Sequence, residues 1–128
     1  MSLPDLPTVK KKREADCTPA ILSWFRANAS KIGSCLIEIK ATTSNSIPAS
    51  AVATHQLAAL RQASGEGLCY KIPDFGYTKK PADAFLLAGS RAFVVCAFLK
   101  HRVVLVIEAD KWHGCRFSSS DYYATFPL

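Results

Sequence analysis

Two charged side chains stand two residues apart in an apolar stretch of the chain, Leu36-Ile37-Glu38-Ile39-Lys40. Because side chains alternate between the faces of a β-strand, a strand here would project Glu38 and Lys40 from one face and the isoleucines from the other. A carboxylate can hold a divalent cation beside a phosphate, and a neighbouring lysine can offset charge or orient an attacking water. The same pair also occurs on solvated strands, where it adds little stability, so both interpretations stay open.

A second polar pair, His55 and Gln56, follows in a stretch with helical periodicity. At about 100° per residue its apolar side chains form one stripe: Val52, Ala53, Leu57, Ala59, Leu60 and Ala63. Gln56 falls near the middle of this stripe, where a polar group without a partner costs about 1–3 kcal/mol. We therefore expect Gln56 to face a polar group beneath the helix or to bond to the backbone. His55, at the edge of the stripe, fits a partly exposed structural or DNA-facing role.

The composition fits one globular domain with a reduced interior. The chain has 128 residues, of which 49% are hydrophobic and 20% charged, so neither wholesale disorder nor a disulfide-dependent scaffold is indicated. A formal charge of +6 favours a polyanionic partner. The five cysteines form no Cys-x-x-Cys pair, which argues against a zinc site and for free thiols in a reducing compartment. With no signal-like or membrane-length apolar segment, we expect a cytoplasmic protein.

The elements that would position these residues can be placed along the chain. Residues 1–15, with the run Lys10-Lys11-Lys12-Arg13, are expected to be a flexible basic lead-in, and residues 16–128 to form the single domain. A first helix is predicted from a Thr18-Pro19 cap to Gly33, and a strand carrying Glu38 and Lys40 from 34 to 41. After a loop, a second helix should run from near Ser50 to Gly65.

The rest of the chain is predicted to be rich in strands. Their expected ranges are 68–73, 84–88, 92–99 and 103–107. The nearly continuous apolar run at 92–99 is typical of a central strand that is covered on both faces. The predicted fold class is α/β, with a mixed central sheet of about four or five strands flanked by helices. An aromatic C-terminal region should form a cap.

This order of elements resembles the PD-(D/E)XK nuclease superfamily, in particular RecU-type Holliday-junction resolvases and related phage proteins. The residues that carry the resemblance are Glu38, Lys40, Pro48, His55 and Gln56. The resemblance spans roughly residues 32–112. It implies a restriction-endonuclease-like core that hydrolyses DNA phosphodiesters with Mg²⁺ or Mn²⁺. It also implies DNA, branched DNA included, as the partner, and a homodimer as the assembly.

One part of the family pattern is missing. The family usually places an aspartate shortly before the Glu-x-Lys strand, and residues 31–36 contain none. Since Mg²⁺ is commonly held by one or two carboxylates, a second acid is wanted beside Glu38. The best replacement is Asp83, which would join Glu38 as a metal ligand in a permuted site if its strand lay beside the Glu38 strand. Asp83 could instead simply bond to turn amides. Asp74 and Glu14 are weaker substitutes.

A rival placement of the motif takes Asp83 as the leading aspartate and Lys100 as the motif lysine. Phe98 then falls at the acidic position. Such a site would lack a metal ligand and would be inactive. The alternative function is therefore a catalytically inactive nuclease-fold protein that binds DNA or serves as a phage accessory protein.

In the active interpretation each candidate residue has a role. Lys40 positions the nucleophile or stabilises developing charge, and Gln56 orients Lys40 or the water. DNA phosphates would be held by a basic set: Lys79, Lys80, Arg91, His55 and the early lysine run.

Overall fold

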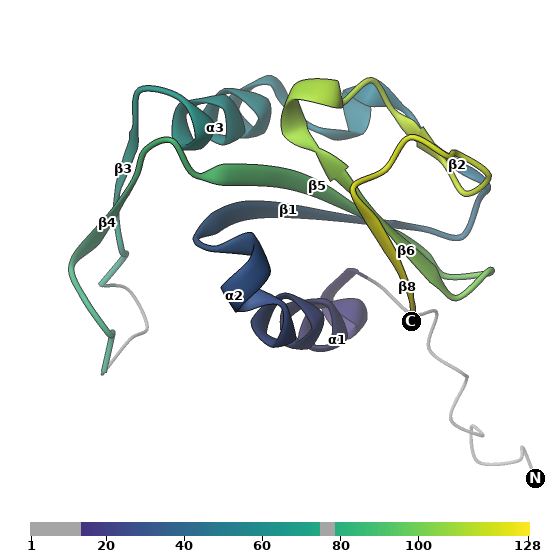
Figure 1. The fold of residues 1–128 in the computed structure, drawn as a ribbon, viewed down its shortest axis with the longest axis horizontal. Coiled ribbons are helices and arrows are strands. Elements are labelled where there is room, and N and C mark those ends of the chain that lie inside the picture. Colours follow the sequence, from purple (N-terminus) through teal and green to yellow (C-terminus); the bar gives the residue numbers. More distant parts are fainter. Residues whose placement is uncertain (1–13, 75–78) are drawn as a thin grey trace, which may run out of the picture.

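A mixed four-stranded sheet forms the centre of the molecule (Figure 1). The computed structural model describes residues 14–74 and 79–128. In the strand order β1-β5-β6-β8, β1 runs parallel to β5, and the other two pairs are antiparallel. The strands of this sheet are β1 (Cys35–Thr42), β5 (Arg91–Phe98), β6 (Val103–Glu108) and β8 (Ala124–Pro127). The predicted α/β class with a mixed sheet is confirmed.

Helices cover both faces of the sheet. Helices α1 (Glu14–Ala27) and α2 (Ala29–Ile32) lie on one face, and α3 (Thr54–Ser64) lies on the other (Figure 1). Because α3 connects the parallel strands β1 and β5, the three elements form a β-α-β unit. Short elements complete the α3 side: β2 (Ser46–Ile47), η1 (Ala49–Ala51), η2 (Ala109–Lys111) and β7 (Cys115–Arg116). No helix in the described ranges is long and apolar enough to cross a bilayer.

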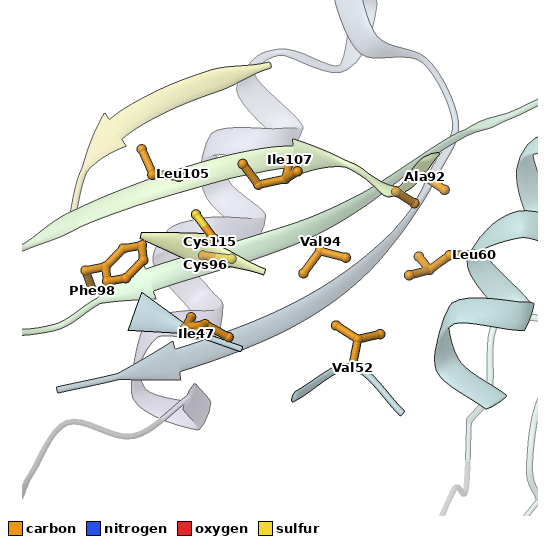
Figure 2. Packing of buried hydrophobic residues seen from close by; sticks show 11 residues of the cluster. Ile47, Val52, Leu60, Ala92, Val94, Cys96, Phe98, Leu105, Ile107 and Cys115 are labelled. Carbon is orange, nitrogen blue, oxygen red and sulfur yellow. The ribbon is translucent and has the colours of Figure 1, made fainter. Parts of the chain in front are cut away.

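Strand β5 is the centre of two hydrophobic cores. Its residues 92–98 are all buried, as the apolar run predicted. Phe93 and Val95 pack with the α1 side, while Val94 and Cys96 pack with the α3 side. Figure 2 shows the α3-side core, in which Val52 and Leu60 lie near Val94. The alternation of apolar side chains therefore anchors one helix layer on each face of β5.

A β-hairpin extends beyond the sheet near the end of α3 (Figure 1). It consists of β3 (Leu68–Lys71) and β4 (Ala84–Leu87), which pair with each other in a separate two-stranded sheet. The rings of Tyr70 and Phe85 stack across it with centroids 5.7 Å apart. Within the described residues no strand pairs with the outer edge of β1, so β1 is an edge strand of the main sheet.

Two predicted helix starts are wrong. Helix α1 begins at Glu14, so Thr18 and Pro19 lie inside it, and the Thr18 hydroxyl donates to the Glu14 carbonyl at 3.0 Å. Burial of Cys17 on the inner face of this first part of the helix favours the earlier start. Helix α3 begins at Thr54, because Val52 is extended and enters the core ahead of the helix. The run Lys10-Lys11-Lys12-Arg13 lies outside the described residues.

Candidate functional site

Glu38 and Lys40 project from β1 toward the α3 side of the sheet. Leu36 packs in the α3-side core, whereas Ile37 and Ile39 pack in the α1-side core. The alternation expected of a strand is therefore present, and it places both charges on one face. Lys40 Nζ lies 3.2 Å from Glu38 Oε1, and the two side chains are 20% and 23% exposed. They form a partly buried ion pair that remains accessible to solvent.

Gln56 from α3 completes this cluster. Its Nε2 donates a 2.9 Å hydrogen bond to Glu38 Oε1, and its Oε1 accepts one of 3.0 Å from the backbone N–H of Ala53. Gln56 is the third residue of the helix, where a glutamine side chain can reach back to the N-cap backbone. The two expectations for Gln56 are thus both met by the same side chain. Its amide fixes the carboxylate of Glu38 relative to the helix.

We call Glu38, Lys40 and Gln56 the acid-lysine cluster. Glu38 Oε1 accepts the hydrogen bond from Gln56 and is paired with Lys40, while Oε2 has no hydrogen-bond partner among the described residues. One oxygen is held in place and the other is available to a ligand. Since the cluster carries one carboxylate and one ammonium, it can contact both a cation and a phosphate oxygen.

A groove opens beside the acid-lysine cluster. It has a volume of about 270 Å³ and lies between β1, α3 and the β3–β4 hairpin. One wall carries Glu38, Gln56 and the exposed His55, and the hairpin contributes Tyr70 and Phe85. The apolar lining is completed by Leu36, Ile37, Ala59, Leu60 and Leu68. The candidate site is therefore a largely apolar cleft with charged groups at one wall.

Asp83 does not lie in the acid-lysine cluster. The condition for a shared site, a strand after Asp83 that lies beside the Glu38 strand, is not met in the structure, because β4 pairs with β3. The Asp83 carboxylate is 88% exposed and lies 3.0 Å from Lys80 Nζ. Strands β3 and β4 pair with each other because pairing between strands close in sequence costs less chain entropy than pairing with a more distant one. Asp83 nevertheless belongs to the same strand face as Phe85, which lines the groove.

The hairpin carries a second set of charges. Asp74 contacts Lys71 at 2.8 Å and also Lys80. Hydrogen bonds from Lys71 and then Lys80 hold the pKa of the Asp74 carboxyl below its usual value. Hydrogen bonds to Asp74 and then Asp83 raise the pKa of Lys80. Asp74 and Lys80 therefore stabilise each other's charged forms.

The predicted DNA-contacting cations are not gathered on one surface. Lys79 is exposed on the hairpin, and Lys80 is paired with two acids. Arg91 lies 3.1 Å from Glu108, and its guanidinium is 4.3 Å from the centroid of the Tyr123 ring. The contacts of Arg91 lie on the α1 side of the sheet, with Tyr123 in that core. Arg91 therefore ties strands together on the face opposite Glu38.

A divalent cation can be tested against these donors. Among residues 14–74 and 79–128, no group of three or more His, Cys, Asp or Glu side chains is placed to hold a metal ion. Mg²⁺ is often bound through one or two carboxylates and completed by water and substrate phosphates. Glu38 fits a cation that a DNA phosphate helps to complete. It does not fit one that the protein holds alone.

Sequence reasoning missed two features near the candidate sites. The first is the aromatic wall of the groove, formed by Tyr70 and Phe85. The two short predicted strands on either side of a loop could have indicated this cross-strand ring pair. Cys96 and Cys115 lie next to each other in the α3-side core (Figure 2), and a side-chain hydrogen bond between their thiols shifts both pKa values. Their proximity could not be predicted from the sequence, because it depends on how β7 packs against β5 in the tertiary structure.

Comparison of the chain with protein-family models, with curated proteins and with solved structures found no match. The functional argument therefore rests on the acid-lysine cluster, the groove and the β-α-β unit that positions them.

Proposed function

We propose that this protein is an endonuclease that hydrolyses DNA phosphodiesters at the acid-lysine cluster, using Mg²⁺ or Mn²⁺. The observation that carries the proposal is the 2.9 Å hydrogen bond from Gln56 to Glu38. Two short motifs, Glu-x-Lys and His-Gln, are far apart in sequence and meet in one cluster. Such a meeting is what a PD-(D/E)XK-like site requires, and a solvated strand pair does not require it.

Each residue of the cluster has a role in this proposal. Lys40 offsets the negative charge that grows on the phosphate oxygens, and its ion pair with Glu38 keeps it beside the reacting group. Gln56 holds the Glu38 carboxylate through Oε1, so that Oε2 can bind the cation. A divalent cation, when bound there, would lower the pKa of a water and neutralise phosphate charge.

We propose Asp83 as the second carboxylate, a role that requires the β3–β4 hairpin to move from its position in the structure, where Asp83 is paired with Lys80. Support comes from its strand face, which it shares with Phe85 on the wall of the groove beside Glu38. The outer edge of β1 is also free of strand partners among the described residues, so a turn of the hairpin toward β1 meets no competing strand. In that position the Asp83 carboxylate would leave its ion pair with Lys80 and bind the cation instead.

This role predicts that Asp83→Asn lowers the cleavage rate by at least about tenfold, because loss of outer-shell partners alone costs about 10–100-fold. The matched control is Asp74→Asn, which removes a carboxylate from the same hairpin and the same lysine. Initial rates on plasmid DNA measure both. If the Asp83→Asn variant cleaves DNA at the wild-type rate, Asp83 is not a ligand of the catalytic cation.

DNA is the proposed partner because the chain carries a formal charge of +6. The exposed Lys79 and His55 are the described candidates for phosphate contacts outside the cluster. Branched DNA as the substrate and a homodimer as the assembly follow from the resemblance. A reducing compartment such as the cytoplasm agrees with the five free cysteines.

A second candidate function is DNA binding without cleavage. It is favoured by one observation, namely that Glu38 is the single acid in the acid-lysine cluster among the described residues. In this case the fold would present the same surface to DNA, but would lack the second ligand that a catalytic cation needs.

Incubation with supercoiled plasmid and with four-way-junction DNA, in Mg²⁺, in Mn²⁺ or in chelator, separates these functions. The endonuclease should cut only with metal, and Glu38→Gln should reduce cutting to background. Glu66→Gln is the control, because Glu66 is an exposed acid just beyond α3. Metal-independent binding without cutting would favour the second candidate. Absence of salt-sensitive binding to either DNA would reject both, leaving a structural or assembly role.

A further inference from the structure

We propose that the groove beside Glu38 binds an unpaired nucleobase, so that the protein selects DNA in which a base next to the bound phosphate is out of the helix. The identity of this ligand rests on the proposed function, because a DNA strand must first lie at the acid-lysine cluster. The inference adds the substrate class: single-stranded, bulged or branched DNA in preference to a continuous duplex.

The aromatic wall of the groove is the first observation. Tyr70 is 53% exposed although its ring has a stacking partner. Phe85 lies beneath it with an interplanar angle of 25° and centroids 5.7 Å apart. A supported ring with an open face is a stacking platform for a base, and each base has a flat face to offer whatever its sequence. The pair therefore provides stacking without base readout.

The size and lining of the groove are the second observation. A volume of about 270 Å³ is slightly below the range of about 300–1,000 Å³ that is typical of pockets for drug-sized ligands. This volume is sufficient for one ring system. Leu36, Leu60 and Leu68 give it an apolar floor, which favours a flat, weakly hydrated group over a charged one.

The charges around the groove are the third observation. Lys40 lies on the same face of β1 as Glu38, with its Nζ 3.2 Å from Glu38 Oε1. Its ammonium group can contact a phosphate next to a base that is held between β1 and the hairpin. An apolar peptide side chain would use the groove but would gain nothing from this cation. A nucleotide uses both features, so it is the occupant to which we commit.

Fluorescence of 2-aminopurine tests this inference, because its emission is quenched when the base stacks on an aromatic ring. The full chain is titrated into oligonucleotides carrying 2-aminopurine at a single-nucleotide bulge, or at a paired position of the matched duplex. Chelator is present, so that binding is measured without cleavage. We expect additional quenching, with tighter binding, for the bulged position only.

Three variants assign the effect to the groove. Tyr70→Leu keeps an apolar side chain but removes the ring, and should weaken binding of the bulged DNA by about tenfold or more. Tyr70→Phe keeps the ring and should retain both the quenching and the affinity. Leu86→Ala is the matched control, because Leu86 is 68% exposed on the opposite face of the same hairpin. Duplex binding should be the same in all three.

The outcomes separate this inference from the proposed function. Equal affinity of Tyr70→Leu and wild type for bulged DNA would overturn the inference, and so would an equal loss on bulged and duplex DNA. Metal-dependent cleavage that persists in that case would leave the endonuclease intact. Ring-dependent binding without any cleavage would support the inference and reject the endonuclease. Failure to bind any DNA would overturn both.

Discussion

At the scale of single residues, Gln56 links the backbone of a helix start to the carboxylate of the proposed site. Its two hydrogen bonds, to Ala53 and to Glu38, are both partly buried. Gln56→Leu keeps the size but leaves Glu38 with one donor and Ala53 N–H with none. We expect the free energy of unfolding to fall by about 1–2 kcal/mol, as measured by urea denaturation.

The control for this change is Gln62→Leu, since Gln62 is an exposed residue of the same helix. It should stay within about 0.5 kcal/mol of wild type. Equal stability of the two variants would mean that the Gln56 contacts contribute nothing net to folding.

The thiols of Cys96 and Cys115 should differ in reactivity. Their mutual hydrogen bond, and then burial, raises the pKa of Cys96. The hydrogen bond from Cys96 lowers the pKa of Cys115 against the opposing effect of burial, and Ser119 assists. A lowered pKa means more thiolate at a given pH, so alkylation of Cys115 should begin at lower pH than that of Cys96.

Cys115 also borders an open pocket of about 340 Å³, which gives a reagent a route to it. Peptide mapping after iodoacetamide treatment over a pH series measures the two rates. The exposed Cys69 serves as the internal reference. Modification of Cys96 as early as Cys115 would contradict the assigned hydrogen-bond direction.

At the scale of elements, the β1-α3-β5 unit was accessible from sequence, and the position of the hairpin was not. The alternation around Glu38, the apolar run of β5 and the periodic stripe of α3 are local patterns whose outcome the packing did not change. The start of α3 was missed because Val52 is buried as an extended residue, which periodicity alone cannot distinguish from a helical one.

The position of Asp83 depends on which strand β4 pairs with, and no local sequence pattern predicts that pairing. The strand after Asp83 could pair with the free edge of β1 or with β3, and local sequence does not decide between them. In the structure it pairs with β3, and Lys80, only three residues away, takes the carboxylate. The residues of the acid-lysine cluster could thus be predicted, because β1 and α3 follow each other in the chain and pack together.

Contact between α3 and the sheet should dominate the stability of this unit. Leu60 is 1% exposed and packs in the α3-side core. Leu60→Ala should lower the free energy of unfolding by about 2–5 kcal/mol, and the loss of helix docking should reduce cleavage as well. Leu22→Ala is the control, because Leu22 is 48% exposed on α1. Similar urea midpoints for the two variants would mean that α3 contributes little to the core.

At the scale of the whole molecule, half of the formal charge of +6 lies in the first thirteen residues, which hold four cations and one acid. If these cations contact DNA, each neutralised phosphate adds about −0.9 to the slope of log K against log salt. Replacing Lys10, Lys11, Lys12 and Arg13 by glutamine should therefore flatten the slope by up to about 3–4. Fluorescence anisotropy of a labelled duplex over a salt series measures this slope.

The control is the double variant Arg26→Gln with Lys31→Gln, on the α1 and α2 side opposite Glu38, which should leave the slope unchanged. Equal slopes for the wild type and the four-residue variant would assign the DNA contacts to the folded domain and make the leading segment a solvated tail.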